Sequence, residues 1–122
     1  MARPIRFMRS EPYTLTSTIR IAVRIPDTVK LRHARLQHCT LTLSPGFQWD
    51  GPSGPTIDTM ATMRASAVHD ALYRMIGEGE LSPFWRAEAD ALLRRLMLED
   101  GAPSWRAWIY WAAVRLFGGF YL

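Results

Sequence analysis

Lysine and cysteine are almost missing from this chain of 122 residues. Its single cysteine, Cys39, excludes an intramolecular disulfide framework and a cysteine-based zinc site. The most apolar stretch, residues 107–122, is interrupted by Arg115 and by two glycines, so we expect no transmembrane helix of about 20 apolar residues. The first ten residues carry three arginines and no apolar run, and we therefore expect no secretory signal peptide.

Positive charge comes from arginine, which supplies fourteen of the fifteen basic residues. Residues 1–44 hold eight basic residues and two acids, a net of +6, whereas residues 45–122 hold seven and nine, a net of −2. The basic half would suit an acidic partner such as phosphate, a membrane or another subunit. Because the arginines are spread out rather than clustered, we favour an ordinary solvated surface. The chain shows no nucleic-acid-binding motif, and nucleic acid is not an expected partner.

The apolar period changes along the chain from about two residues to about 3.6, which predicts an α+β fold in a single domain. Alternating β-branched residues over 13–25 predict a half-buried strand of a small antiparallel sheet or hairpin. Further strand residues follow a turn at Pro26-Asp27, and a change of phase indicates a bulge near 34–37. We expect His33 and His38 to be ordinary strand side chains.

The carboxy-terminal part predicts a structured loop and a three-helix bundle. Residues 44–58 hold three prolines and three glycines, which argues against a regular element. Helices are expected over 60–76, from Ser82-Pro83 to about 99, and from 103–104 to 117, because capping residues and glycines flank each of them. The expected segments are an arm (1–12), strands (13–43), a loop (44–58), helices (59–117) and an aromatic tail (118–122).

Four polar residues of the first two predicted helices form a chemically interpretable group. His69 and Tyr73 are four positions apart and share one helix face, while Asp70 is rotated by about 100°. Helical projection brings Asp90 of the second helix towards His69, and Arg86 towards either acid. A histidine held by a carboxylate can act as a general base, and a second carboxylate can hold a hard cation. The group also fits a structural clamp, which we favour on residue chemistry alone, because buried polar groups need partners.

Four motifs in order resemble the domain-of-unknown-function 1353 family, which is widespread in tailed bacteriophages and prophages. They read GFQWDGPS at 46–53, VHDALYR at 68–74, RAEAD at 86–90 and AVRLFG at 113–118. The chain departs from the pattern after Ser53, where Gly-Pro replaces the more usual hydrophobic-proline pair. The resemblance implies a phage origin and supplies no established activity.

The His-Asp-x-x-Tyr sequence with an Asp on the next helix also resembles the active-site helix pair of secreted phospholipase A2. The resemblance implies that His69 activates water, that Asp70 binds calcium, and that Tyr73 and Asp90 orient the histidine. The cysteines of that family and its glycine-rich calcium loop are absent. Residues 47–54 take the corresponding place before the helix, where Asp50 could supply a second metal carboxylate.

We therefore predict a phage-encoded, virion- or tail-associated structural protein whose partners are other phage proteins, with no cofactor. It would reside in the virion, or in the host cytoplasm during assembly. The alternative is a calcium-dependent, phospholipase A2-like ester hydrolase that acts on lipid or at a membrane.

Ligand contact is predicted for Asp50, Phe47, Trp49 and Arg86. We also expect Asp50 or Asp70 to form a salt bridge to an arginine rather than to hold a metal, because calcium normally takes six or more oxygen ligands.

Aromatic residues are dense in the third predicted helix, and we expect most of them to belong to the protein's own core. They are Trp105, Trp108, Tyr110, Trp111 and Phe117. Residues 120–122 are not easily buried together at the end of the chain, and we expect them to serve as an anchor.

Overall fold

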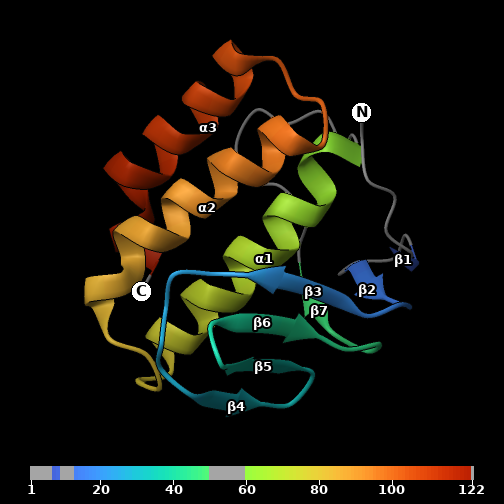
Figure 1. The fold of residues 1–122 in the computed structure, drawn as a ribbon. Helices are drawn as coiled ribbons and strands as arrows, with labels where there is room; N and C mark the ends of the chain where they lie inside the picture. Colours follow the sequence, from blue (N-terminus) through green and yellow to red (C-terminus); the bar gives the residue numbers. More distant parts are fainter. Residues whose placement is uncertain (1–6, 9–12, 50–59, 122) are drawn as a thin grey trace.

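The computed structural model describes residues 7–8, 13–49 and 60–121, and within them strands precede helices, which confirms the α+β prediction (Figure 1). The strands are β1 (Phe7–Met8), β2 (Tyr13–Leu15), β3 (Ile19–Ala22), β4 (Val29–Leu31), β5 (Ala34–Gln37), β6 (Thr40–Leu43) and β7 (Gln48–Trp49). The α-helices are α1 (Met60–Gly77), α2 (Arg86–Glu99) and α3 (Ser104–Phe117), with short 3-10 helices at η1 (Pro83–Trp85) and η2 (Gly118–Tyr121).

The strands form two antiparallel sheets, and the segment predicted as one continuous first strand contributes to both. The first sheet has the order β1-β2-β7 and the second has the order β3-β6-β5-β4. The half-buried alternation predicted over 13–25 is present in β2 and β3, but the prediction of one continuous strand was wrong, because the chain breaks after Leu15 and its two parts join different sheets. The prediction of no regular element within 44–58 was also wrong, since Trp49 pairs with Tyr13 across β2 and β7.

Two tight hairpins, rather than a bulge, explain the change of phase between residues 28 and 43. Leu31 pairs with Ala34, and Gln37 pairs with Thr40, so each turn contains two residues. Because each turn reverses the chain, the buried residues change from odd-numbered positions in β4 to even-numbered positions in β5, and back to odd-numbered positions in β6. His33 lies in the first turn (φ 67°), and His38 (φ 53°) and Cys39 (φ 54°) form the second, so the two histidines are not strand side chains.

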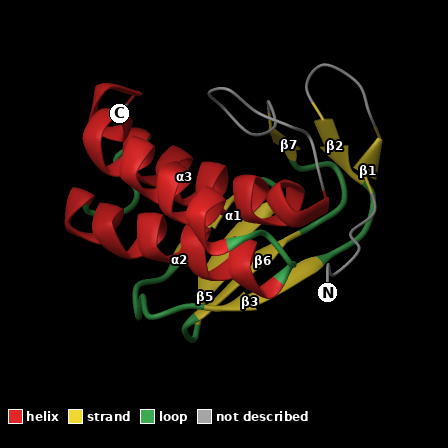
Figure 2. Cartoon of the chain, turned by 90° about the horizontal axis from the view of Figure 1, so that it is seen from above, coloured by secondary structure: helices red, strands yellow, loops and turns green. Residues whose placement is uncertain are grey.

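The helices lie on one side of the four-stranded sheet, as the view from above shows (Figure 2). Strand residues facing them are buried, and α1 is buried along most of its length because it lies between the sheet and the other two helices. Predicted helix ends were accurate for α1 and α3. Ser82 accepts a hydrogen bond from the Phe84 amide as predicted for a cap, but it begins η1, and α2 itself starts only at Arg86.

A buried ion pair joins the beginning of α1 to the end of α2. Arg64 donates from Nε to Asp100 Oδ2 (2.8 Å) and from one terminal nitrogen to Oδ1 (2.9 Å), and it also reaches Glu99 Oε1 at 3.2 Å. Such a two-pronged contact fixes direction as well as distance. Arg64 and Asp100 are both buried, so removal of either would leave the other charge without its partner.

The prediction that most aromatic residues of α3 belong to the core was wrong, although Tyr110 does pack against the core. Ala107 is the buried residue of this helix, while Trp105, Trp108 and Phe117 are exposed. The reason is visible in Figure 1, where α3 lies on the side of α2 away from the sheet and, among the described elements that precede it, packs mainly against α2. The expected anchor at 120–122 lies outside the residues whose side chains are described. None of the described helices is long and apolar enough to span a membrane.

The turn between β5 and β6 is strained, because side-chain-bearing residues rarely adopt positive φ. We predict that His38→Asn with Cys39→Gly raises the free energy of unfolding by about 1 kcal/mol, since Asn-Gly suits a two-residue hairpin turn. Urea denaturation measures the change. As a control, Cys39→Val should lower stability at the same exposed position; an Asn-Gly variant no more stable than the wild type would contradict the interpretation.

Candidate functional site between the three helices

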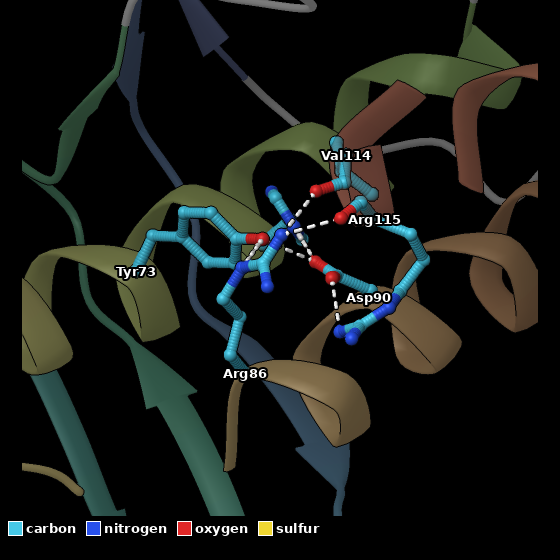
Figure 3. A network of polar contacts seen from close by, with 6 residues as sticks. Tyr73, Arg86, Asp90, Val114 and Arg115 are labelled. Atoms are coloured by element: carbon cyan, nitrogen blue, oxygen red, sulfur yellow. Dashed lines mark hydrogen bonds and ion pairs between the residues drawn. The ribbon is translucent and has the colours of Figure 1, made fainter. Parts of the chain in front are cut away.

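A fully buried carboxylate on α2, that of Asp90, gathers side chains from both other helices. Its Oδ1 lies 2.7 Å from His69 Nε2 and accepts a hydrogen bond from the Tyr73 hydroxyl at 2.6 Å. Its Oδ2 accepts from a terminal nitrogen of Arg115 at 2.9 Å (Figure 3). The predicted contact between His69 and Asp90 is therefore confirmed.

Helical spacing produces this arrangement. His69 and Tyr73 lie one turn apart on α1 and their rings pack at a centroid distance of 4.1 Å. Small and branched neighbours such as Ala89 and Leu93 are buried beside them and let α1 and α2 approach closely. Asp90 consequently enters the seam between the helices, where it needs several donors to compensate for lost water.

The carboxyl group of Asp90 is the acidic group of this site, and the site favours its ionised form. Burial acts to raise the pKa of Asp90, but hydrogen bonds from His69, Tyr73 and Arg115 outweigh it and lower that pKa below its ordinary value. Burial and the neighbouring carboxylate raise the pKa of Tyr73, which therefore stays a neutral donor. An ionised carboxylate has acceptors only, so the His69 nitrogen facing it, Nε2, carries a proton.

The second ring nitrogen of His69 remains available for chemistry. With a proton on Nε2, the neutral ring has its lone pair on Nδ1, and no hydrogen bond from a described residue to Nδ1 is formed. The His69 side chain is 12 % exposed, so it borders the surface. The arrangement can orient an imidazole for proton transfer, and it can equally hold three helices together.

Arg86 and Arg115 have roles that the sequence prediction did not assign. Arg86 donates from Nε to the Tyr73 hydroxyl (3.2 Å) and from a terminal nitrogen to the backbone carbonyls of Val114 and Arg115 (both 2.8 Å), rather than pairing with an acid. The Val114 carbonyl also accepts from the Gly118 backbone amide, so Arg86 adds a second donor there and binds the Arg115 carbonyl in the same last turn of α3. Arg115 was missed, although it lies in the AVRLFG motif, because 25 residues separate it from Asp90.

Arg74 fulfils the prediction that an arginine would pair with Asp70. One of its terminal nitrogens donates to Asp70 Oδ2 at 2.7 Å and to the Gln48 carbonyl at 2.6 Å. The guanidinium also lies over the Phe47 ring, 4.8 Å from its centre. Arg74 thus connects β7 to α1. Asp50, the other acid of this prediction, lies outside the described residues.

The described residues do not fit a calcium site. Asp70, the described member of the predicted ligand pair, is bound to Arg74, and so is the Gln48 carbonyl. Within 13–49 and 60–121, no group of three or more potential metal ligands from His, Cys, Asp and Glu comes together. Calcium prefers six to eight oxygens, and we therefore derive no chemical step through this ion.

Phe47 and Trp49, two of the predicted ligand-contacting residues, are buried. Their rings stack at 6.1 Å, and Trp49 Nε1 donates to the Ser66 hydroxyl at 3.1 Å. In the described structure Trp49 connects β7 to α1 through Ser66, and the Phe47 ring packs against the Arg74 guanidinium.

An α+β protein with a buried carboxylate shared by three helices is thus the class that the fold and the site define. The chain belongs to the family described as "Protein of unknown function (DUF1353)", whose model matches residues 28–114. This match covers β4 to most of α3 and includes His69, Tyr73 and Asp90. No curated protein and no solved structure matches the chain.

Gly118 leaves the space that the Tyr73 hydroxyl needs. A Cβ at this position would collide with that hydroxyl, whereas a Cβ at Gly119 would meet Arg86 only at an ordinary 3.7 Å. We predict that Gly118→Ala lowers the free energy of unfolding by about 1–3 kcal/mol, since the clash disturbs a buried hydrogen bond. Gly119→Ala is the matched control and should change it by less than about 0.5 kcal/mol in the same denaturation experiment. Equal effects would contradict the assigned contact.

The lowered pKa of Asp90 predicts an acid-sensitive fold. The unfolded chain binds a proton near the ordinary value of 3.8, while the folded protein does so only at lower pH. The stabilisation by Asp90 is therefore complete above 3.8 and is lost as the pH falls through the lowered folded value. Asp90→Asn should cost on the order of 3 kcal/mol at neutral pH and give a flatter decline in stability below pH 4. Thermal unfolding measured across pH gives the stability of the wild type and of the variant. A parallel decline of the two stabilities below pH 4 would contradict the lowered pKa of Asp90.

Proposed function

We propose that this protein is a structural or interaction protein of a bacteriophage particle, which docks on a neighbouring subunit through α3. The observation that carries the proposal is that α3 exposes five large apolar side chains and buries only Ala107. These side chains, which we call the outer face of α3, are Trp105, Trp108, Ile109, Leu116 and Phe117, and they are 45 % to 69 % exposed.

The outer face of α3 is a helical stripe. Trp105, Trp108, Ile109 and Leu116 fall within an arc of about 100° around the helix. Val114, on the opposite side, packs against the core. Soluble monomers rarely expose contiguous apolar patches of this kind without an interaction partner. A helix that presents residues at such spacing is a known way to fill a groove in another protein.

Charge indicates which partner fits. α3 contains no acid, and its Arg106 lies beside the stripe, whereas the charge of Arg115 is compensated by Asp90. A second copy of the chain would bring like charges together around the stripe, which disfavours self-association. We therefore assign the face to a different subunit, with an apolar groove and an acidic rim. The phage setting rests on the family resemblance of the four sequence motifs, and the virion, or the host cytoplasm during assembly, is the corresponding location.

The polar cluster supports this function by fixing α3. Arg86 binds two backbone carbonyls in the last turn of α3. The side chain of Arg115, which belongs to the same turn, binds Asp90. An interface needs a rigid helix, because ordering a mobile one on binding reduces the affinity.

The test uses the phage or prophage whose genome encodes the chain. Particles are purified after complementation with wild type, Trp108→Glu or Leu116→Glu, and the protein is quantified by mass spectrometry. We predict that wild-type protein is retained at a fixed copy number and that both variants are lost at least tenfold. Leu98→Glu, an equivalent change of an exposed leucine on α2, is the control. Wild-type protein missing from particles, or stripe variants retained as well as the control, would overturn the proposal.

A second candidate is hydrolysis of an ester, with His69 as the general base. The observation favouring it is the contact of 2.7 Å between His69 Nε2 and Asp90, which leaves Nδ1 to take a proton from water. Tyr73 binds the same carboxylate oxygen and restricts its position. Phospholipid is the substrate class suggested by the sequence resemblance.

Turnover of a fluorogenic phospholipid, with and without calcium, separates the two candidates. The hydrolase hypothesis predicts activity in the wild type and a loss of at least 100-fold, about 2.7 kcal/mol of transition-state stabilisation, in a folded His69→Gln variant. The interaction hypothesis predicts no turnover above the level of that variant. Calorimetry should detect no calcium binding tighter than about 100 μM, because Arg74 occupies the oxygens of Asp70 and Gln48.

A further inference from the structure

A row of cations crosses the face of the four-stranded sheet that turns away from the helices. The strand register places Arg20 opposite Thr42, Thr42 opposite Arg35, and Arg35 opposite Lys30. All four alternate with buried neighbours, so they share the outer face, and the three cations are exposed. Neighbouring strands are about 4.8 Å apart, which brings Arg35 and Lys30 directly beside one another.

Within the described part of the chain, these cations have no acidic partner. Residues 13–49 contain five cations and one acid, Asp27. Among the described ion pairs, none involves Arg20, Arg35 or Lys30. Like charges directly opposite one another on a sheet are destabilising. The fold therefore keeps an arrangement that a bound anion would relieve.

The same face of the sheet carries a depression, and Arg20, Arg35 and Thr42 of the row contribute to its lining. This depression of about 490 Å³ is lined by Arg20 and Arg35, by seven further polar residues, and by Leu31 and Ala34. The polar groups are the hydroxyls of Thr18, Thr40, Thr42 and Ser44, the amide of Gln37 and the imidazoles of His33 and His38. Gln37 contacts His38, Ser44 contacts His33, and the Thr40 hydroxyl donates to the His38 carbonyl, so the two arginines, Thr18 and Thr42 are the lining groups with no hydrogen bond to another described residue through their donors. This volume lies within the range of small-molecule sites, about 300–1,000 Å³.

We propose that this depression binds a compact anion with two or more adjacent phosphate groups. Arginine recognises phosphate through two parallel hydrogen bonds, and threonine and serine hydroxyls add further donors. The lining contains no acid and no Phe, Tyr or Trp ring. The site therefore has neither a platform for stacking the bases of single-stranded nucleic acid nor the aromatic anchor typical of a protein interface. Its concave shape and small size favour a compact polyphosphate over the backbone of a long duplex.

The sheet can support such a site because its other face is anchored. Ile19, Ile21, Leu36 and Leu41 are buried towards the helices, and they hold the strands in register beneath the cations. Two tight hairpin turns place His33 and His38 at opposite ends of β5, at the rim of the depression. The proposal is independent of the docking function assigned to α3, which lies on the other side of the molecule from this sheet.

The probe is tripolyphosphate, titrated into the full chain by calorimetry at about 50 mM salt. We expect saturable binding that weakens as salt rises, as counterion-linked binding does. Arg20→Gln with Arg35→Gln should weaken it at least tenfold. Arg24→Gln with Arg32→Gln removes the same charge outside the depression and should weaken it less than twofold.

A second measurement keeps the test independent of folding defects. Because Arg35→Gln removes the like charge that lies opposite Lys30, the thermal unfolding midpoint of the Arg20→Gln, Arg35→Gln variant should equal or exceed that of the wild type. Absence of tripolyphosphate binding to the wild type, or equal weakening in both double variants, would overturn the proposal. So would binding of a 20-base-pair duplex by the wild type, dependent on Arg20 and Arg35, without binding of tripolyphosphate.

Discussion

The arrangement of the helices depends on one carboxylate, that of Asp90. It projects from α2 and accepts hydrogen bonds from His69 and Tyr73 of α1 and from Arg115 of α3. Removal of a carboxylate from water costs several kcal/mol, and partners with good geometry must offset that cost. Since the donors come from two different helices, the folded state satisfies Asp90 only when all three helices are in place.

Further contacts extend this constraint to the end of α3. Tyr73 receives a hydrogen bond from Arg86, Arg86 binds two carbonyls of α3, and Gly118 admits the Tyr73 hydroxyl. At the other end of the helix pair, Arg64 and Asp100 form a second buried contact between α1 and α2. The helical layer is thus fixed by polar contacts inside, while the outer face of α3 stays apolar and exposed. Rigid support behind an exposed surface is what a docking site requires.

Local signals in the sequence predicted much of this structure. Capping residues and glycines located the helices closely, and helical projection found the contact between His69 and Asp90 because it depends on spacing within two regular elements. The hairpin turns were missed, since His33, His38 and Cys39 adopt positive φ without the usual glycine or asparagine signal. Burial of α3 was overestimated because apolar composition does not reveal whether a helix has neighbours on every side. The contact of Arg64 with Asp100 joins residues 36 positions apart and has no local signature.

Amide hydrogen exchange in Asp90→Asn tests most directly whether this carboxylate holds α3. Exchange reports the free energy of local opening for each segment. We predict that Asp90→Asn makes the amides of residues 104–117 exchange at least tenfold faster than in the wild type, after normalisation to the amides of β3 and β6. Asp70→Asn, the same change at an exposed position of α1, should leave exchange in α3 at the wild-type rate. A correctly folded Asp90→Asn protein whose α3 exchanges as slowly as in the wild type would contradict the account.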